Sequence, residues 1–205
     1  LMASLNQSLK RMRLDYVDLF YSHRYDPETP LEETLQALVD IVRSGKALYV
    51  GISRWPLEAL KFAHNYLKER DVPLLIYQGR INLLDRSPIE DGILDFCADN
   101  GIGFISFSPL AQGLLTDRYL NGIPQDSRMH RNTSLSPNTL NPELISKLHQ
   151  WNQIAANRNQ SLSEMALSWV LAQRGITSVL IGASSVEQLE RNLRCVNATP
   201  LIQAL

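Results

Sequence analysis

The chain has 205 residues, with 20 lysines and arginines against 21 aspartates and glutamates, and 44% of the residues are apolar. This length and apolar content can supply a core that needs no disulfide or metal staple, which excludes a disordered protein. The balanced charge argues against a dedicated nucleic-acid binder or membrane-surface binder. The two cysteines, Cys97 and Cys195, have no metal-ligand spacing. We therefore expect one soluble, cytoplasmic domain over residues 1–205, without a metal, nucleic-acid or membrane partner.

The first residues already follow a helical pattern. Leu1, Leu5, Leu9 and Met12 fall on one stripe, and no N-cap residue precedes them. A helix that has started before the first residue suggests a processed or truncated piece of a longer protein.

From residue 15 onward, short apolar runs alternate with amphipathic segments. The apolar runs predict strands at 15–22, 46–53, 74–78, 103–108 and 178–182. Helices are predicted to begin at residues 31, 56, 87, 142, 161 and 184, and the one at 87 is expected to run to about residue 101. Three of these helices open with the pattern of a capping box, at 87–90, 161–164 and 184–187.

Strands that are apolar on both faces, each followed by a helix, indicate an α/β fold with a parallel sheet covered by helices. Five such units fit either an open doubly wound sheet or part of an eight-unit barrel, and periodicity does not choose between them. Residues 109–141 show no clear period and contain several glycines and prolines. Connections of this length are uncommon in compact domains and are usually functional.

Ligands of parallel α/β folds bind at the carboxyl ends of the strands, so candidate functional residues are sought there. The first strand ends at His23, which is either a hydrogen-bonded structural residue or a group that polarises a carbonyl and helps to move a proton. The next two strands are followed by polar residues, namely Ser53, Arg54, Gln78 and Asn82. Amides suit recognition of another amide, such as the nicotinamide carboxamide, and the alternative is helix and loop capping by the same side chains.

Later strand ends offer an aromatic ring and cations. Phe107 ends the fourth strand, and burial in the core is favoured over stacking on a flat ring. The long segment that follows carries basic residues that suit a phosphate clamp, namely Arg118, Arg128, His130 and Arg131. The last strand leads through Gly182, Ala183 and Ser184 into a helix N-terminus, where Ser184 is either an N-cap alone or part of an anion site.

Several common motifs are absent from the sequence. It has no G-x-G-x-x-G after a strand, no Walker loop, no H-E-x-x-H and no G-x-S-x-G, which disfavours a Rossmann-type dinucleotide site. A pocket with amides, an aromatic ring and arginines suits a phosphorylated ligand that carries a ring.

Five segments, in order along the chain, carry a resemblance to a known family: LDYVDLFYSHR, ALYVGISRW, INLLDR, SFSPLAQGLLTDRYLNGIP and SVLIGASSVEQLERN. Together they resemble the aldo-keto reductases, and the run PLAQGLLTDRYLNGIPQDSRMHR is most similar to the branch of the potassium-channel β-subunits and bacterial L-glyceraldehyde 3-phosphate reductases. The resemblance implies an incomplete (β/α)8 TIM barrel, in which these strands correspond to the fourth through the eighth. The first three βα units and a C-terminal segment would be absent.

The resemblance also implies reduction of carbonyl compounds with NADPH. The family's active site holds an Asp, a Tyr, a Lys and a His, and only the His has a counterpart in this chain, His23. The implied cofactor-binding residues are the carboxamide set Ser53, Arg54 and Gln78, the ring neighbour Phe107, the pyrophosphate loop Ser108, Pro109, Leu110 and Ala111, the phosphate ligands Arg118 and Arg128, and the adenosine set Gly182, Ser184, Gln188 and Asn192.

Three positions depart from the family's pattern. Asp117 and Arg118 stand where the family usually has Gly and Lys, and Arg191 replaces the usual Glu at the adenine end. The added positive charge of Arg191 is expected to attract the 2′-phosphate, so a preference for NADPH over NADH should survive.

Three hypotheses about function follow. The first is an NADPH-dependent aldo-keto reductase, an oxidoreductase for small aldehydes and ketones of a sugar-phosphate-like or methylglyoxal-like kind, with a homo-oligomer left open. The second is a nucleotide-sensing regulatory subunit. The third is an inactive, truncated product.

Overall fold

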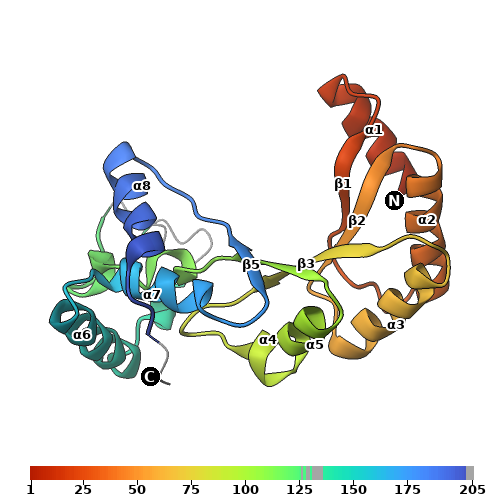
Figure 1. The fold of residues 1–205 in the computed structure, drawn as a ribbon. Coiled ribbons are helices and arrows are strands. Elements are labelled where there is room, and N and C mark those ends of the chain that lie inside the picture. Colours follow the sequence, from red (N-terminus) through yellow and green to blue (C-terminus); the bar gives the residue numbers. More distant parts are fainter. Residues whose placement is uncertain (126, 128–129, 131–135, 202–205) are drawn as a thin grey trace. The chain divides into compact units, whose positions relative to one another are not determined.

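The computed structural model describes residues 1–125, 127, 130 and 136–201. Strands and helices alternate along the chain, as Figure 1 shows. The strands are β1 (Val17–Ser22), β2 (Ala47–Ser53), β3 (Leu74–Arg80), β4 (Gly103–Phe107) and β5 (Ile176–Val179). The α-helices are α1 (Met2–Met12), α2 (Leu31–Arg43), α3 (Leu57–Lys68), α4 (Ser87–Glu90), α5 (Ile93–Asp99), α6 (Pro142–Asn157), α7 (Leu162–Leu171) and α8 (Val186–Leu193).

The chain divides into two compact units. The first unit holds Leu1–Gly79 and Ser87–Ile105, and the second holds Arg80–Arg86 and Ser106–Leu205. A single domain over residues 1–205 stays a prediction.

The first unit is built on parallel strands. β1 pairs with β2 in parallel, and β2 pairs with β3 in the same way. Helices α2 and α3 lie beside β1 and β2 (Figure 1), and Leu35, Leu38 and Leu60 are fully buried there. This confirms the prediction that apolar strands and amphipathic helices form a parallel α/β sheet.

The second unit joins β5 to the end of β4. The backbone N–H of Leu180, just after β5, donates to the carbonyl of Ser106 at 2.8 Å. Helix α7 contributes a large part of the core of this unit, since eight of its ten side chains are buried. It begins at a capping box, in which Ser161 and Glu164 each satisfy the other's backbone N–H, as the sequence predicts.

Three predicted boundaries are wrong. The helix expected over 87–101 is two helices, α4 and α5, because Gly92 between them adopts a left-handed conformation with φ 75°. The last strand is Ile176–Val179, and residues 180–184 follow it without regular structure. Helix α8 is capped by Ser185, one residue later than the predicted Ser184.

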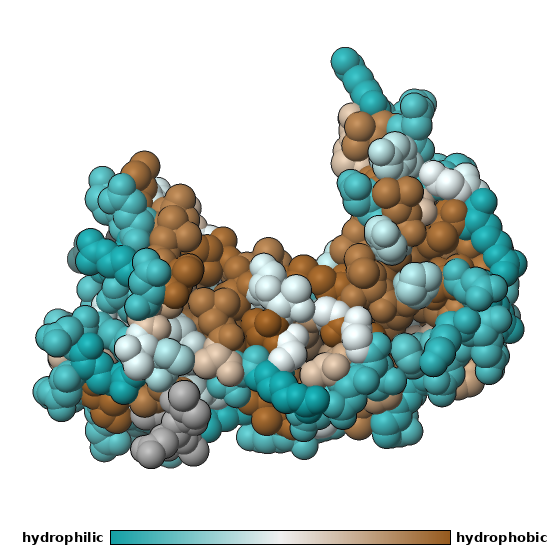
Figure 2. Space-filling view, viewed as in Figure 1, coloured by the Kyte–Doolittle hydropathy of each residue, from teal (hydrophilic) through white to brown (hydrophobic). Residues whose placement is uncertain are grey.

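Part of the apolar surface of the first unit is accessible to solvent. Leu48 and Tyr49 on β2 are 48% and 42% exposed, and Leu14 and Tyr16 before β1 are 51% and 50% exposed. Figure 2 shows brown, apolar residues along the face of this unit that carries β1 and β2. In the described part of the chain, no helix combines the length and the apolar character that crossing a membrane requires.

Candidate functional site

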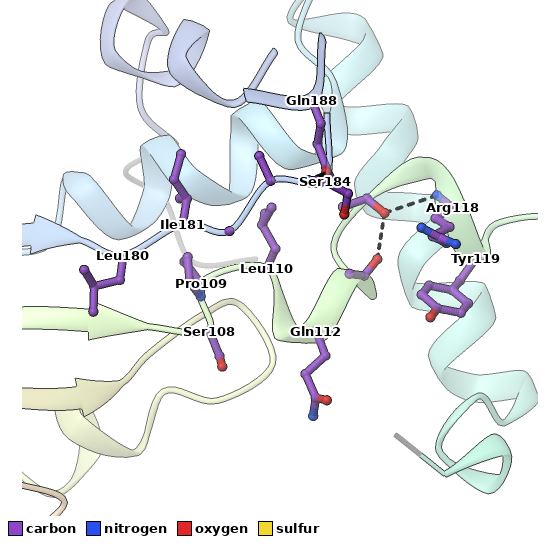
Figure 3. A pocket seen from close by; sticks show the side chains of 14 residues that line it. Ser108, Pro109, Leu110, Gln112, Arg118, Tyr119, Leu180, Ile181, Ser184 and Gln188 are labelled. Atoms are coloured by element: carbon purple, nitrogen blue, oxygen red, sulfur yellow. Dashed lines mark hydrogen bonds between the residues drawn. The ribbon is translucent and has the colours of Figure 1, made fainter. Parts of the chain in front are cut away.

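A cavity of about 610 Å³ lies in the second unit, between the segment that follows β4 and the segment that follows β5. Figure 3 shows its lining residues as sticks, with Leu180, Ile181 and Ser184 on one side and Ser108, Leu110 and Gln112 on the other. The cavity therefore lies beyond the carboxyl ends of β4 and β5, and parallel α/β folds bind their ligands at such strand ends.

The turn after β4 has a strained backbone. Ser108, Ala111 and Gln112 have φ values of 52°, 46° and 60°, in the left-handed region that side chains disfavour. Backbone hydrogen bonds stabilise the turn. The Ala111 N–H donates to the Ser108 carbonyl at 3.0 Å, and the Gly113 N–H donates to the Leu110 carbonyl at 2.8 Å. Strain of this kind persists where surrounding structure enforces it and is typical of ligand sites. Of the residues expected to form the pyrophosphate loop, Ser108, Pro109 and Leu110 line the cavity.

Arg118 is positioned at the cavity by a second turn. The Thr116 hydroxyl donates to the Gly113 carbonyl at 2.7 Å and accepts from the Arg118 N–H at 3.2 Å (Figure 3). Arg118 lines the cavity, and its role as a phosphate ligand stays a prediction. Arg128 and Arg131 lie outside the described residues, and His130 is exposed.

The N-terminus of α8 forms the opposite wall. The Ser185 hydroxyl accepts from Gln188 N–H at 3.2 Å, and Gln188 Oε1 accepts from Ser184 N–H at 2.7 Å. The expected box from Ser184 to Glu187 is wrong, because Ser185 takes the capping role and Val186 begins the helix. Ser184 and Gly182 line the cavity outside the cap, which leaves the Ser184 hydroxyl available to a ligand.

Asn192 lies on α8, one helical turn beyond Gln188. It is 2% exposed and is absent from the cavity lining. Its amide nitrogen Nδ2 has no hydrogen-bond partner among the described residues. A buried donor without a partner costs about 1–3 kcal/mol, so this amide is unsatisfied in the structure as it stands.

In the first unit, four predicted site residues lie at or near the ends of adjacent strands. His23 directly follows β1 and is exposed. Ser53 ends β2 in register with Gln78 on β3, and its hydroxyl donates to the Gln78 carbonyl at 3.0 Å. The N–H of Arg54, a residue with φ 58°, donates to the same carbonyl at 3.2 Å. The strained Arg54 backbone is thus fixed by the neighbouring strand.

Asn82, by contrast, is a structural residue. Its Nδ2 donates to the Ser108 carbonyl at 3.0 Å, and its Oδ1 accepts from Leu84 N–H and Asp85 N–H at 2.9 and 3.0 Å. The amide is occupied by backbone groups, so the capping alternative holds here. Asn82 also fixes the carbonyl of Ser108, where the strained turn begins.

Phe107 is half-buried and lines a separate cavity of about 470 Å³ within the second unit. The prediction that it is buried in the core is therefore wrong. The strand pattern explains this, because Phe104 and Ser106 on β4 take the fully buried positions and Phe107 falls on the other face.

The sequence does not single out every cavity residue. Gln112, Thr116, Tyr119, Leu180 and Ile181 line the cavity as well. A Thr two residues before Arg118 is a local capping signal that predicts the second turn. Leu180 and Ile181 carry no such signal, since they belong to an apolar run typical of a strand. Among the described residues, no group of three or more His, Cys, Asp or Glu is placed to hold a metal ion.

Comparisons with known proteins agree with this geometry. The sequence model of the Aldo/keto reductase family matches residues 1–204. The L-glyceraldehyde 3-phosphate reductase of Escherichia coli K12 is 54% identical over 201 residues, which are 96% of this chain and 58% of that protein. A probable voltage-gated potassium channel subunit beta of Oryza sativa subsp. japonica is 33% identical, over 97% of this chain and 62% of that protein.

A solved structure is similar as well. A thermostable aldo-keto reductase in complex with the inhibitor epalrestat matches with a TM-score of 0.70 and 31% identity, over 97% of this chain and 61% of that chain. The five βα units are thus part of an aldo-keto reductase (β/α)8 barrel, which confirms the predicted fold class. The chain spans about three fifths of the length of the relatives it matches. It belongs to the aldo/keto reductase family.

Proposed function

We propose that this chain is part of an oxidoreductase that reduces small aldehydes and ketones to alcohols with NADPH. The carrying observation is the cavity of the second unit, whose strained turn, Arg118 and α8 N-terminus face one space. Guanidinium groups, hydroxyls and a helix N-terminus bind phosphate, so this donor set fits the phosphate-bearing part of a dinucleotide. When bound, NADPH supplies the hydride, and a proton from the protein or water completes the alcohol.

Different residues would bind different parts of the dinucleotide. Arg118, Ser184 and the Ser108–Leu110 turn would hold phosphate groups, and Gln188 would lie nearer the adenosine. Asn192, with its unsatisfied amide, is a further candidate for the adenosine end. Ser53, Arg54 and Gln78 would hold the carboxamide through their remaining polar groups, since Ser53 and Arg54 already donate to a backbone carbonyl.

His23 would orient the substrate and help to move a proton to the reacting oxygen. An exposed imidazole at the end of β1 can donate a hydrogen bond to a carbonyl oxygen and raise its electrophilicity. The 54% identical relative bears the name of a reductase of a phosphorylated aldehyde, which supports the same substrate class here over a purely regulatory role.

The test uses protein expressed from the complete gene. NADPH is titrated by fluorescence, and reduction of methylglyoxal and glyceraldehyde 3-phosphate is followed by the loss of NADPH absorbance. We expect Arg118→Ala to weaken NADPH binding by about 1.5–3 kcal/mol, the scale of a charged hydrogen bond. Arg194→Ala, which removes an exposed arginine outside the cavity lining, should leave the NADPH affinity unchanged.

His23 is tested separately by His23→Gln. The variant should bind NADPH as the unaltered protein does but lose about 10²-fold or more in kcat, because an acid–base group typically contributes that much. No NADPH binding by the unaltered protein, or equal effects of Arg118→Ala and Arg194→Ala, contradicts the proposal.

A further inference from the structure

In the second unit, an ion pair joins the two chain segments that carry the residues lining the cavity. Arg191 Nη1 lies 3.3 Å from Asp117 Oδ2, although the two residues are 74 positions apart in the chain. Asp117 directly precedes Arg118, and Arg191 lies three residues, or about one helical turn, beyond Gln188. Arg118 and Gln188 both line the cavity, so the pair lies next to the proposed phosphate site on each side.

The ion pair reduces the positive charge that Arg191 presents to a ligand. A guanidinium is charged at every accessible pH and presents donors that match a phosphate. In this structure the Asp117 carboxylate accepts from Nη1 and offsets the positive charge of the guanidinium. The expectation that Arg191 attracts the 2′-phosphate treated its charge as unopposed, and the structure shows that it is opposed.

Exposure to solvent weakens the attraction between Asp117 and Arg191. The Arg191 and Asp117 side chains are 46% and 68% exposed, so water and salt compete with their attraction. Loss of one partner is therefore expected to free the other and not to collapse the surroundings.

We propose that Asp117 is a specificity-determining residue that acts through Arg191. By holding the guanidinium, Asp117 lowers the preference of the site for a dinucleotide that carries a 2′-phosphate over one that lacks it. This rests on the proposed function, because it takes the cavity to bind the phosphate-bearing end of the dinucleotide.

The experiment uses Asp117→Asn, which keeps the shape of the side chain and removes its charge, in protein expressed from the complete gene. Dissociation constants for NADPH and for NADH are measured at low ionic strength and again with added salt. The ratio of the NADH constant to the NADPH constant should rise by about two- to fivefold, the scale of one exposed charge pair, and the rise should shrink with salt.

A matched background separates an effect through Arg191 from a direct effect of the Asp117 charge. In Arg191→Gln, the further change Asp117→Asn should leave the ratio unmoved. An equal rise in that background, or an unmoved ratio in the single variant, overturns the role of Asp117 while the proposed function stands. An unaltered protein that binds neither dinucleotide overturns the proposed function and this inference with it.

Discussion

Cys97 on α5 lies completely inside the core of the first unit. Burial raises the pKa of its thiol to about 12, because the charged thiolate loses its hydration there. An unfolded chain exposes the same thiol with an ordinary pKa near 8.5. The native state therefore keeps a proton that the unfolded state releases as the pH rises above that value.

This difference predicts a pH dependence of stability. Below the unfolded pKa both states hold the proton and Cys97 contributes no slope. Above it the free energy of unfolding should fall, by at most about 1.4 kcal/mol per pH unit, until the pH reaches the folded pKa. Urea unfolding of the unaltered protein and of Cys97→Ala at several alkaline pH values measures the difference in slope. Parallel slopes in the two proteins would contradict the shift.

Some features of the site can be predicted from neighbouring residues in the sequence, and others depend on the folded chain. Arg118 and Ser184 both line the cavity. Ser184 closely follows a recognisable apolar run, whereas Arg118 lies in the long segment without a clear period, where only its charge singles it out. The occupation of the Asn82 amide follows from three backbone groups, one of which belongs to Ser108, and only the folded chain brings that one to it. The choice between Ser184 and Ser185 as the cap also depends on backbone conformation, since both are good capping residues.

At the scale of elements, the closeness of β1, β2 and β3 depends on Gly51. A Cβ atom added at Gly51 would lie 2.7 Å from Tyr21 Cε1 on β1 and 2.8 Å from Ile76 Cγ2 on β3. Real Cβ contacts are longer, so a side chain here forces the strands or their side chains apart. A glycine inside a strand often marks such a close approach.

Gly51→Ala should therefore destabilise the protein by about 1–3 kcal/mol, the usual cost of overpacking a core. Urea unfolding measures it, and Gly182→Ala is the matched control, because an added Cβ there meets no atom within 4 Å. The control should change the free energy of unfolding by less than about 0.5 kcal/mol. A cost for Gly51→Ala no larger than that of the control would show that the strands adjust freely.

Helix boundaries are likewise predicted correctly where neighbouring residues determine them, and missed where the local sequence is compatible with two conformations. The α7 capping box is correctly predicted because Ser161 and Glu164 are three residues apart and satisfy each other. The break between α4 and α5 is missed because a glycine inside a helical pattern is compatible with either a continuous helix or a left-handed turn.

At the scale of the whole molecule, the chain spans about three fifths of the length of its relatives, and we expect the proposed activity to need more than its five βα units. The family resemblance implies an Asp, a Tyr and a Lys beside His23 in the active site, and it assigns none of these three to a position of this sequence. Acid–base groups contribute about 10² to 10⁴ in rate. We predict that residues 1–205 purified alone show no NADPH-dependent aldehyde reduction above background, whereas protein from the complete gene turns over. Robust turnover by the 205-residue chain would show that the assignment of the active site is wrong.

The sequence alone determined the order of the strands and helices, the parallel α/β class and the polar residues at the strand ends, because periodicity and capping act over a few neighbouring positions. The tertiary structure decided which of these residues share a cavity, that Phe107 lies outside the core, and that Asn192 is buried with an unsatisfied amide. It also decided that Asp117 meets Arg191. Each of these depends on segments far apart in the chain being packed together, and contacts of that kind leave no periodic trace in a single sequence.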